Sequence, residues 1–146
     1  MEKKEKQSFT VIAQYIKDLS FESPTSPQCF INVQDQTPRI QINVQVNSNR
    51  ISDTDFDVEL SFDVEAKHDE NVLFHLEISY GGLFRISNFP KENIPAILFV
   101  ESPRLLFPFV RQIISNTIKD GGFPPLMIDT IDFLKLFKQK VASNDK

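Results

Sequence analysis

The chain has 146 residues, a single cysteine and a formal net charge of −4 at pH 7, which is typical of one domain whose core needs neither disulfides nor metal ions. The acidic balance argues against nucleic acid as a partner, because phosphate binding requires clustered positive charge. The lone Cys29 and the lack of an apolar leader predict a cytoplasmic protein, and the longest apolar run, residues 94–100, is far shorter than the roughly 20 residues of a membrane span.

The N-terminal quarter predicts one long strand and a break. Residues 9–21 alternate loosely, although Val11, Ile12 and Ile16 also allow a helix. Pro24 and Pro27 then interrupt the pattern, and residues 29–33 are expected to form a short extended piece before a turn at 35–38. The strand would place on one face Phe9, Val11, Ala13, Tyr15, Leu19 and Phe21.

Three further segments alternate between apolar and polar residues with a period of two, which is typical of half-buried strands. They are residues 39–47, 56–66 and 72–80, and the last is expected to end in a bulge at Gly81 and Gly82. Their short polar connections predict an antiparallel meander with one solvent-facing side and one covered side. The second of them contributes to an acidic run without Lys or Arg: Asp53, Asp55, Asp57, Glu59, Asp63 and Glu65.

Two helices are expected to cover the sheet. Ser102 is predicted to cap the first, with Pro103 in its first turn, Pro108 bending it and Gly121 as its left-handed stop. The second is expected after Asp129. The fold class is therefore α+β: a four-stranded antiparallel sheet with C-terminal helices on one face, in a single domain with disordered tails at residues 1–8 and 142–146.

The first helix is apolar around more of its circumference than so small a chain can cover. This surplus predicts subunit packing, binding of apolar partners, or both. The chain also has 14 Phe, 2 Tyr and no Trp. Phenyl rings contact apolar groups without forming hydrogen bonds. The stripe consists of Leu105, Leu106, Phe109, Val110, Ile113, Ile114, Thr117 and Ile118, widened by Phe107.

No residue pattern indicates catalysis, a cofactor or a metal. His68 lies in a polar turn, and His75 is expected on the solvent-facing side of its strand beside Glu77, without a second His or a Cys at metal-ligand spacing. Asp129 and Asp132 are three residues apart, which would suit acid–base chemistry but is more typical of a helix N-terminus. We therefore expect a protein that is not an enzyme.

Three segments show that the chain resembles the SecB family of bacterial export chaperones. They are YIKDLSFESPTSP at 15–27, LFHLEISYGGLF at 73–84 and SPRLLFPFVRQIISNTIKDGGFPPLMIDTIDF at 102–133. The resemblance implies a homotetramer, a dimer of dimers, whose helices lie between two eight-stranded sheets. It also implies a cytoplasmic holdase that binds unfolded preproteins without ATP and delivers them to the motor SecA, without inserting into the membrane itself.

The resemblance also assigns roles to residues. A client-binding groove beside the loop between Pro24 and Pro38 and the last helix would involve Phe30, Phe74, Leu76, Ile78, Tyr80 and Phe84. The SecA contact would involve Asp18, Glu22, His75 and Glu77. The tetramer interface would be formed by Leu105, Leu106, Phe109, Val110, Ile113 and Ile114.

The chain departs from the family pattern at three places. His75 replaces an apolar residue in the SecA contact, no aromatic precedes Pro38, and the tail after Phe137 is short and mixed in charge. Two alternatives compete with the holdase. One is an adaptor or antitoxin-type chaperone of the same fold with one dedicated partner. The other is a hot-dog thioesterase, which the order of strands before helix disfavours.

Overall fold

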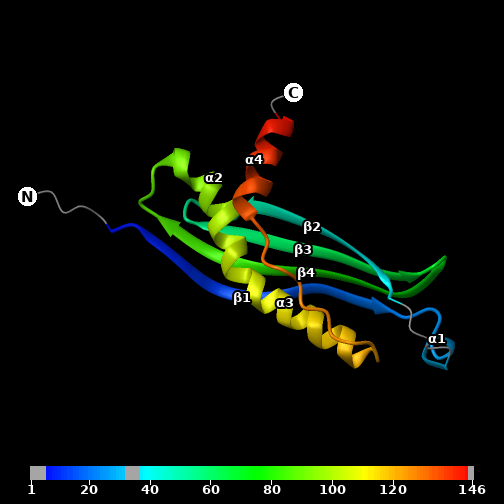
Figure 1. Cartoon of the computed structure of the whole chain (residues 1–146). Coiled ribbons are helices and arrows are strands. Elements are labelled where there is room, and N and C mark those ends of the chain that lie inside the picture. The colour runs from blue at the N-terminus through cyan, green and yellow to red at the C-terminus, as the bar shows by residue number, and fades with distance from the viewer. Residues whose placement is uncertain (1–5, 32–36, 145–146) are drawn as a thin grey trace, which may run out of the picture.

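The computed structural model describes residues 6–31 and 37–144 and confirms the α+β fold, with one four-stranded antiparallel sheet and helices on one of its faces (Figure 1). The strand order is β1-β4-β3-β2, so the three later strands form the predicted meander while β1 pairs with β4. The strands are β1 Ser8–Glu22, β2 Arg39–Arg50, β3 Asp55–His68 and β4 Asn71–Ser87.

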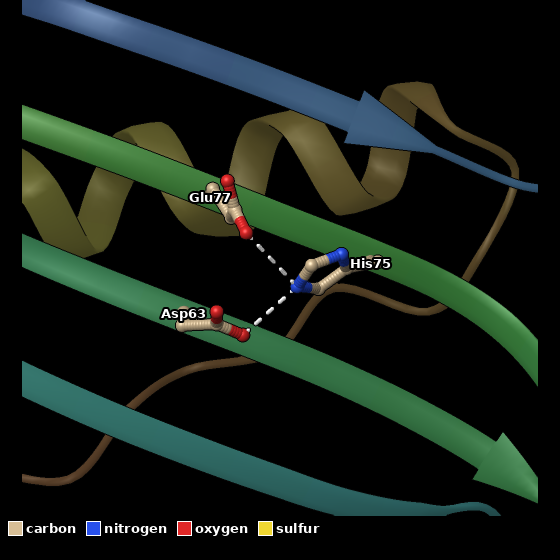
Figure 2. A group of neighbouring side chains, drawn as sticks. All are labelled: Asp63, His75 and Glu77. Atoms are coloured by element: carbon tan, nitrogen blue, oxygen red, sulfur yellow. Dashed lines mark hydrogen bonds and ion pairs between the residues drawn. The ribbon is translucent and has the colours of Figure 1, made fainter.

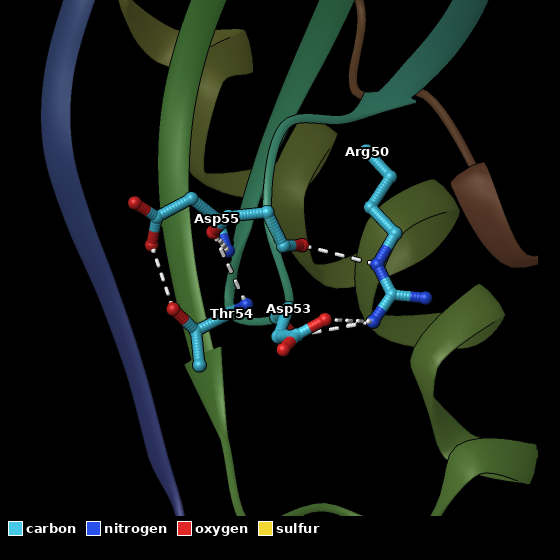
Figure 3. A network of polar contacts seen from close by, with 5 residues as sticks. Arg50, Asp53, Thr54 and Asp55 are labelled. Atoms are coloured by element: carbon cyan, nitrogen blue, oxygen red, sulfur yellow. Dashed lines mark hydrogen bonds and ion pairs between the residues drawn. The ribbon is translucent and has the colours of Figure 1, made fainter.

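The period of two in β3 and β4 determines which side of the sheet is buried. All six alternate apolar residues of β3 from Phe56 to Ala66 are buried, and so are those of β4 from Phe74 to Tyr80. Full burial of each such side chain stabilises the fold by about 1.5–3 kcal/mol relative to exposure. The turn between β2 and β3 is held by Arg50, whose Nη2 lies 3.5 Å from Asp53 Oδ1, and by the Thr54 hydroxyl, which donates to Asp55 (Figure 3).

The prediction that Ala13 and Tyr15 share a face with Phe9 and Phe21 is wrong. Register shifts between Val11 and Ala13 and between Ile16 and Asp18 change the side on which the residues lie. Tyr15 consequently lies on the outer face of the sheet, where its hydroxyl donates to Asp57 Oδ1 at 2.6 Å. Phe9 and Phe21 still pack against the core as expected.

The predicted strand end and bulge at the two glycines of β4 are also wrong, because β4 continues in register to Ser87. A Cβ at Gly81 would lie 2.4 Å from the Tyr15 ring on the outer face, and one at Gly82 would lie 2.5 Å from the Phe84 ring on the inner face. Each glycine therefore leaves room for an aromatic ring rather than bending the strand.

The covering helix begins earlier than predicted. A continuous helical stretch consists of η1 Lys91–Asn93, α2 Ile94–Ala96, the π-helical η2 Ile97–Glu101 and α3 Ser102–Asp120. Ser102 is therefore not a cap, because its backbone is already helical and its hydroxyl donates to the Ile97 carbonyl at 2.8 Å. Pro108 lies inside α3, and the bend expected there stays a prediction.

By length and composition, the stretch Lys91–Asp120 could cross a membrane, and 44% of its most apolar 18-residue window is buried within the protomer. A core helix that packs on a sheet passes the same test, and α3 packs on β3 and β4 (Figure 1). Its buried side contains Leu106, Phe107, Val110, Ile114 and Ile118.

The helix ends and short elements differ in detail from the predictions. α3 stops at Gly121 as predicted, but the left-handed residue is Gly122, with a φ of 96°. The extended piece predicted from residue 29 is instead a short helix, α1 Gln28–Ile31, because Cys29 and Phe30 close helical hydrogen bonds onto Thr25 and Pro27. Val33 and the turn at 35–36 lie outside the described residues.

The last helix is α4 Phe133–Asn144, which starts a few residues later than expected. Asp132 caps it by accepting a hydrogen bond from the Lys135 N–H at 3.0 Å, as expected for an acidic residue at a helix N-terminus. Within the predicted tails, Ser8 already belongs to β1 and residues 142–144 to α4, whereas residues 1–5 and 145–146 lie outside the described part of the chain.

Candidate functional site

The outer side of the sheet, which the helices do not cover, forms a surface that we call the acidic face. The residues predicted to contact SecA meet here, because Glu22 pairs with His75 across β1 and β4 while Asp18 pairs with Ser79 on the same side. On the neighbouring strand, Asp63 pairs with Glu77. The carboxylates of this face are Asp18, Glu22, Asp55, Asp57, Glu59, Asp63, Glu65 and Glu77.

Part of this charge is neutralised at one end of the face. Arg85 donates two hydrogen bonds to Asp55, at 2.8 and 3.1 Å, and holds the pKa of that carboxyl below its usual range. Hydrogen bonds from Ser79 and Lys17 likewise lower the pKa of Glu59.

Tyr15 lies at the same end of the face, with its hydroxyl against Asp57. Burial, the hydrogen bond to Asp57 and the nearby Glu59 together raise the pKa of Tyr15 to about 12. Among the described residues, Asp18, Glu22, Asp63 and Glu77 form no ion pair with Lys or Arg. The net negative charge is therefore concentrated around His75.

His75 lies between two carboxylates at the centre of this group (Figure 2). Its Nε2 atom is 2.9 Å from Asp63 Oδ1 and 3.4 Å from Glu77 Oε1. The hydrogen bond to Asp63 raises the pKa of His75, and the nearby charges of Glu77 and Glu65 act in the same direction. An imidazole held in this way can carry a proton or coordinate a cation.

The opposite side of the protomer carries apolar surface beyond its core. Along α3, the residues predicted for the tetramer interface divide into two sets. Leu106, Val110 and Ile114 are fully buried against the sheet and Ile113 is partly buried, whereas Leu105 is 36% exposed and Phe109 is 50% exposed. The outer side of α3 is thus the part that a second subunit can contact.

A second apolar surface, which we call the aromatic cluster, lies where α1 approaches the end of α3. It consists of Phe21, Phe30, Phe74 and Phe123, whose neighbouring rings lie 5.0–6.5 Å apart between centroids. Phe30 is 40% exposed. The two glycines after α3 make this contact possible, because a Cβ at Gly121 would strike Phe21 and one at Gly122 would strike Phe30.

A third apolar surface, the β2–α4 groove, encloses about 280 Å³ between an edge strand and the last helix. The rings of Phe99 and Phe137 stack in it with their centroids 5.9 Å apart. Lys140 Nζ lies 4.4 Å from the centroid of the Phe99 ring and donates to the Val46 carbonyl. Sequence reasoning missed Phe99 and Lys140, because their meeting depends on how α4 folds back onto β2. The groove is lined by Val44, Gln45, Val46, Asn47, Phe99, Leu136, Phe137 and Lys140.

Most residues predicted for the client groove lie in the core instead of at the surface. Leu76, Ile78, Tyr80 and Phe84 are buried between the sheet and the helices, and only Phe30 presents a large exposed ring. Phe74 is buried like the core residues, but its ring also packs against Phe123 in the aromatic cluster. The missing aromatic before Pro38 concerns Gln36, which is outside the described residues, and Thr37.

Comparisons with known proteins agree with this architecture. A sequence model of the SecB family, described as preprotein translocase subunit SecB, matches residues 2–144. The protein-export protein SecB of Mesorhizobium japonicum is 54% identical over 137 residues, which are 94% of this chain and 81% of that protein. The protein-export protein SecB of Bartonella bacilliformis is 49% identical over 142 residues, 97% of this chain and 89% of that protein.

A solved structure shares the fold at low sequence identity. It is the Mycobacterium tuberculosis Rv1957 SecB-like chaperone in complex with a ChAD peptide from the Rv1956 HigA1 antitoxin, with a TM-score of 0.70 and 12% identity. The match covers 84% of this chain and 90% of that one. The family model and the two relatives show that the chain belongs to the SecB family and has a chaperone role in protein export.

Proposed function

We propose that this chain, as a single SecB-like domain, is an ATP-independent holdase of the cytoplasm that assembles as a homotetramer, a dimer of dimers. It would keep unfolded preproteins competent for translocation and deliver them to SecA. The observation that carries the proposal is the contrast between an acidic face and three apolar surfaces on the other side, formed by α3, by the aromatic cluster and by the β2–α4 groove.

Two of the apolar surfaces suit client binding. Phe30 and the β2–α4 groove offer rings and methyl groups that contact apolar side chains with little directional demand, so selectivity would be for unfolded chains rather than for a sequence. Burial of about 1,000 Å² of a client's apolar surface contributes on the order of 25 kcal/mol before ordering costs. Such binding needs no nucleotide, and a long client that reaches several subunits gains avidity.

The apolar surface on the outer side of α3 suits assembly. Leu105 and Phe109 lie on the outer side of α3, where they would pack against a second dimer, and this would place the helices between two sheets. The acidic faces would then point outward on both sides of the tetramer, free to contact a partner.

Aggregation of a chemically denatured client tests the holdase activity. We expect near-stoichiometric tetramer to suppress light scattering when the client is diluted, without added ATP and after apyrase treatment. Phe30→Ser should weaken the suppression several-fold, because it removes an exposed ring, whereas Gln28→Ser on the same short helix should not. Unchanged scattering with the wild-type chain would reject the holdase function.

Binding to SecA tests the acidic face separately. Charge reversal by Asp18→Lys with Glu22→Lys should weaken binding at low salt at least ten-fold, because both carboxylates lie on this face without cationic partners among the described residues. Glu92→Lys with Asp120→Lys changes the net charge equally, far from this face in the sequence, and serves as the control. Equal affinities for the two variants at low salt would count against the assignment.

A dedicated adaptor is the second candidate function. It is favoured by one observation, namely that the solved SecB-like chaperone with this fold is in complex with a peptide from an antitoxin. An adaptor would bind one partner segment tightly and leave unrelated unfolded clients to aggregate. The scattering experiment with several unrelated clients distinguishes the two.

A further inference from the structure

We propose that Asp63, His75 and Glu77 form a binding site for a divalent transition-metal ion such as Zn²⁺ on the acidic face. The three residues offer one imidazole nitrogen and two carboxylate oxygens that all lie within 4.8 Å of one another (Figure 2). His75 and Glu77 are also proposed to contact SecA, so the metal site is tested with neither SecA nor a client present.

The spacing of the ligand atoms fits such an ion. Zinc lies roughly 2.0–2.2 Å from nitrogen and oxygen ligands, so two ligands of a tetrahedral ion are about 3.3 Å apart. Nε2 of His75 is 2.9 Å from Asp63 Oδ1 and 3.4 Å from Glu77 Oε1. Small rotations of the side chains would therefore bring all three atoms to coordination distance.

The backbone holds the three residues in place. Asp63 and Glu77 are directly paired on β3 and β4, the two central strands of the sheet, and His75 lies two residues before Glu77 on the same side. A site on paired central strands is more rigid than one on a loop, so little conformational entropy is lost when an ion binds. Asp63 reaches the other two residues through the hairpin register, which residue spacing along the chain does not predict.

The surroundings leave room for an ion and its water. A hollow of about 280 Å³ lies beside the cluster, lined by polar side chains that include Gln41 and Asn43 of β2. The side chains of Asp63, His75 and Glu77 are 47%, 29% and 50% exposed, so an ion can reach them and water can complete its coordination.

The ligand set favours certain ions over others. Imidazole suits Zn²⁺, Ni²⁺ and Cu²⁺, whereas Ca²⁺ and Mg²⁺ prefer oxygen ligands alone. Asp63 and Glu77 have no Lys or Arg partner within the described ranges, so an ion would have to displace only the proton of His75. Glu65, which faces His75 across the strands, is already paired with Lys67 at 3.4 Å.

Calorimetric titration of the untagged full chain with ZnCl₂ tests the proposal. We expect one ion per chain in the wild type and at least a ten-fold weaker affinity in Asp63→Asn and in His75→Ala, since each removes one of three protein ligands. His68→Ala is the matched control, because His68 is the last residue of β3, beside Asp69 and not between two strand carboxylates, and this variant should bind as the wild type does.

NMR of the histidine rings provides a second readout that does not depend on the variants. Addition of Zn²⁺ should shift the ring signals of His75 and leave those of His68 unchanged. Equal Zn²⁺ affinity in the wild type and His75→Ala, or no shift of the His75 ring at an excess of Zn²⁺, would overturn the proposal. The latter result would mean that the imidazole between these carboxylates binds a proton and not a metal ion.

Discussion

The two faces of the sheet are built from the same strands but have opposite chemistry. On β3, Phe56, Val58 and Leu60 are buried beneath the helices, while the alternating Asp55, Asp57 and Glu59 point outward. The inner side chains of β3 are closed off from partners and stabilise the fold. The outer face contributes little to folding and remains available for recognition. The period of two in a strand thus separates the residues that hold the structure from those that can serve a partner.

The largest expected effect is on the inner face. Leu106 is fully buried on the side of α3 that faces the sheet, and Leu106→Ala should lower the free energy of unfolding by about 2–5 kcal/mol through lost burial and a residual cavity. Urea denaturation followed by circular dichroism measures this change. Leu134→Ala on α4 removes the same atoms from a side chain that is 40% exposed, and its cost should be much smaller. Equal losses would contradict the assignment of the two environments.

The outer side of α3 should affect assembly rather than folding. Phe109→Ser removes a half-exposed ring, and loss of an aromatic anchor from an interface costs about 2–4 kcal/mol of association free energy. Sedimentation equilibrium should therefore show dissociation at concentrations where the wild type stays assembled, with an unchanged circular dichroism spectrum. Lys119→Ser, an exposed change on the same helix, is the control. An unaltered mass for Phe109→Ser would place the interface elsewhere.

The adjacent glycines of β4 compare the two faces at neighbouring positions. An added methyl at Gly82 would lie 2.5 Å from the Phe84 ring and 3.0 Å from Leu106, both fully buried, so Gly82→Ala should cost about 1–3 kcal/mol. At Gly81 the methyl would meet only the Tyr15 ring, which is partly exposed and can swing into solvent.

Thermal or urea unfolding of both glycine variants measures the difference. Gly81→Ala should lower the free energy of unfolding less than Gly82→Ala, because it displaces the Tyr15 ring and loses its hydrogen bond to Asp57. A larger loss for Gly81→Ala would show that the outer face is packed as tightly as the inner one.

The smallest effect is expected from a single hydrogen bond on the acidic face. Ser79 donates to Glu59 and lowers its pKa, so Ser79→Ala should raise that pKa and cost about 0.5–1.5 kcal/mol at pH 7. Because the folded pKa lies below the unfolded value, this stabilisation is present above the unfolded pKa and is lost as the pH falls through the folded one. The two proteins should therefore converge in acid. An NMR titration of the Glu59 carboxyl checks the shift, and an unmoved pKa would contradict it.

The sequence predicted the strands β2, β3 and β4 and the buried face of β3 and β4, because alternation depends only on local order. On β2 the predicted inward face stays partly exposed, and Ile40 and Ile42 are 40% and 38% exposed. The sequence did not predict the bulges of β1, since their positions depend on pairing with β4, more than sixty residues away. It also misplaced the start of the covering helix. A Ser next to a Pro is typical of a cap, but Ser102 is preceded by residues that are already helical.

For the candidate site, the acidic residues could be assigned to one face from the sequence, whereas their neighbours could not. The contact of His75 with Asp63 depends on the register of the β3–β4 hairpin, and a slip by one residue would move His75 to the inner face. The apolar surplus of α3 was also visible in the sequence. Its division into a buried and an exposed side required the direction from which the helix meets the sheet.

The central claim is that the apolar surface left exposed by one protomer is covered by further copies of the chain. The native mass at micromolar concentration tests it most directly, measured by native mass spectrometry or light scattering after gel filtration. We expect a particle of four chains of 16.8 kDa each. A particle with the mass of one chain would contradict it.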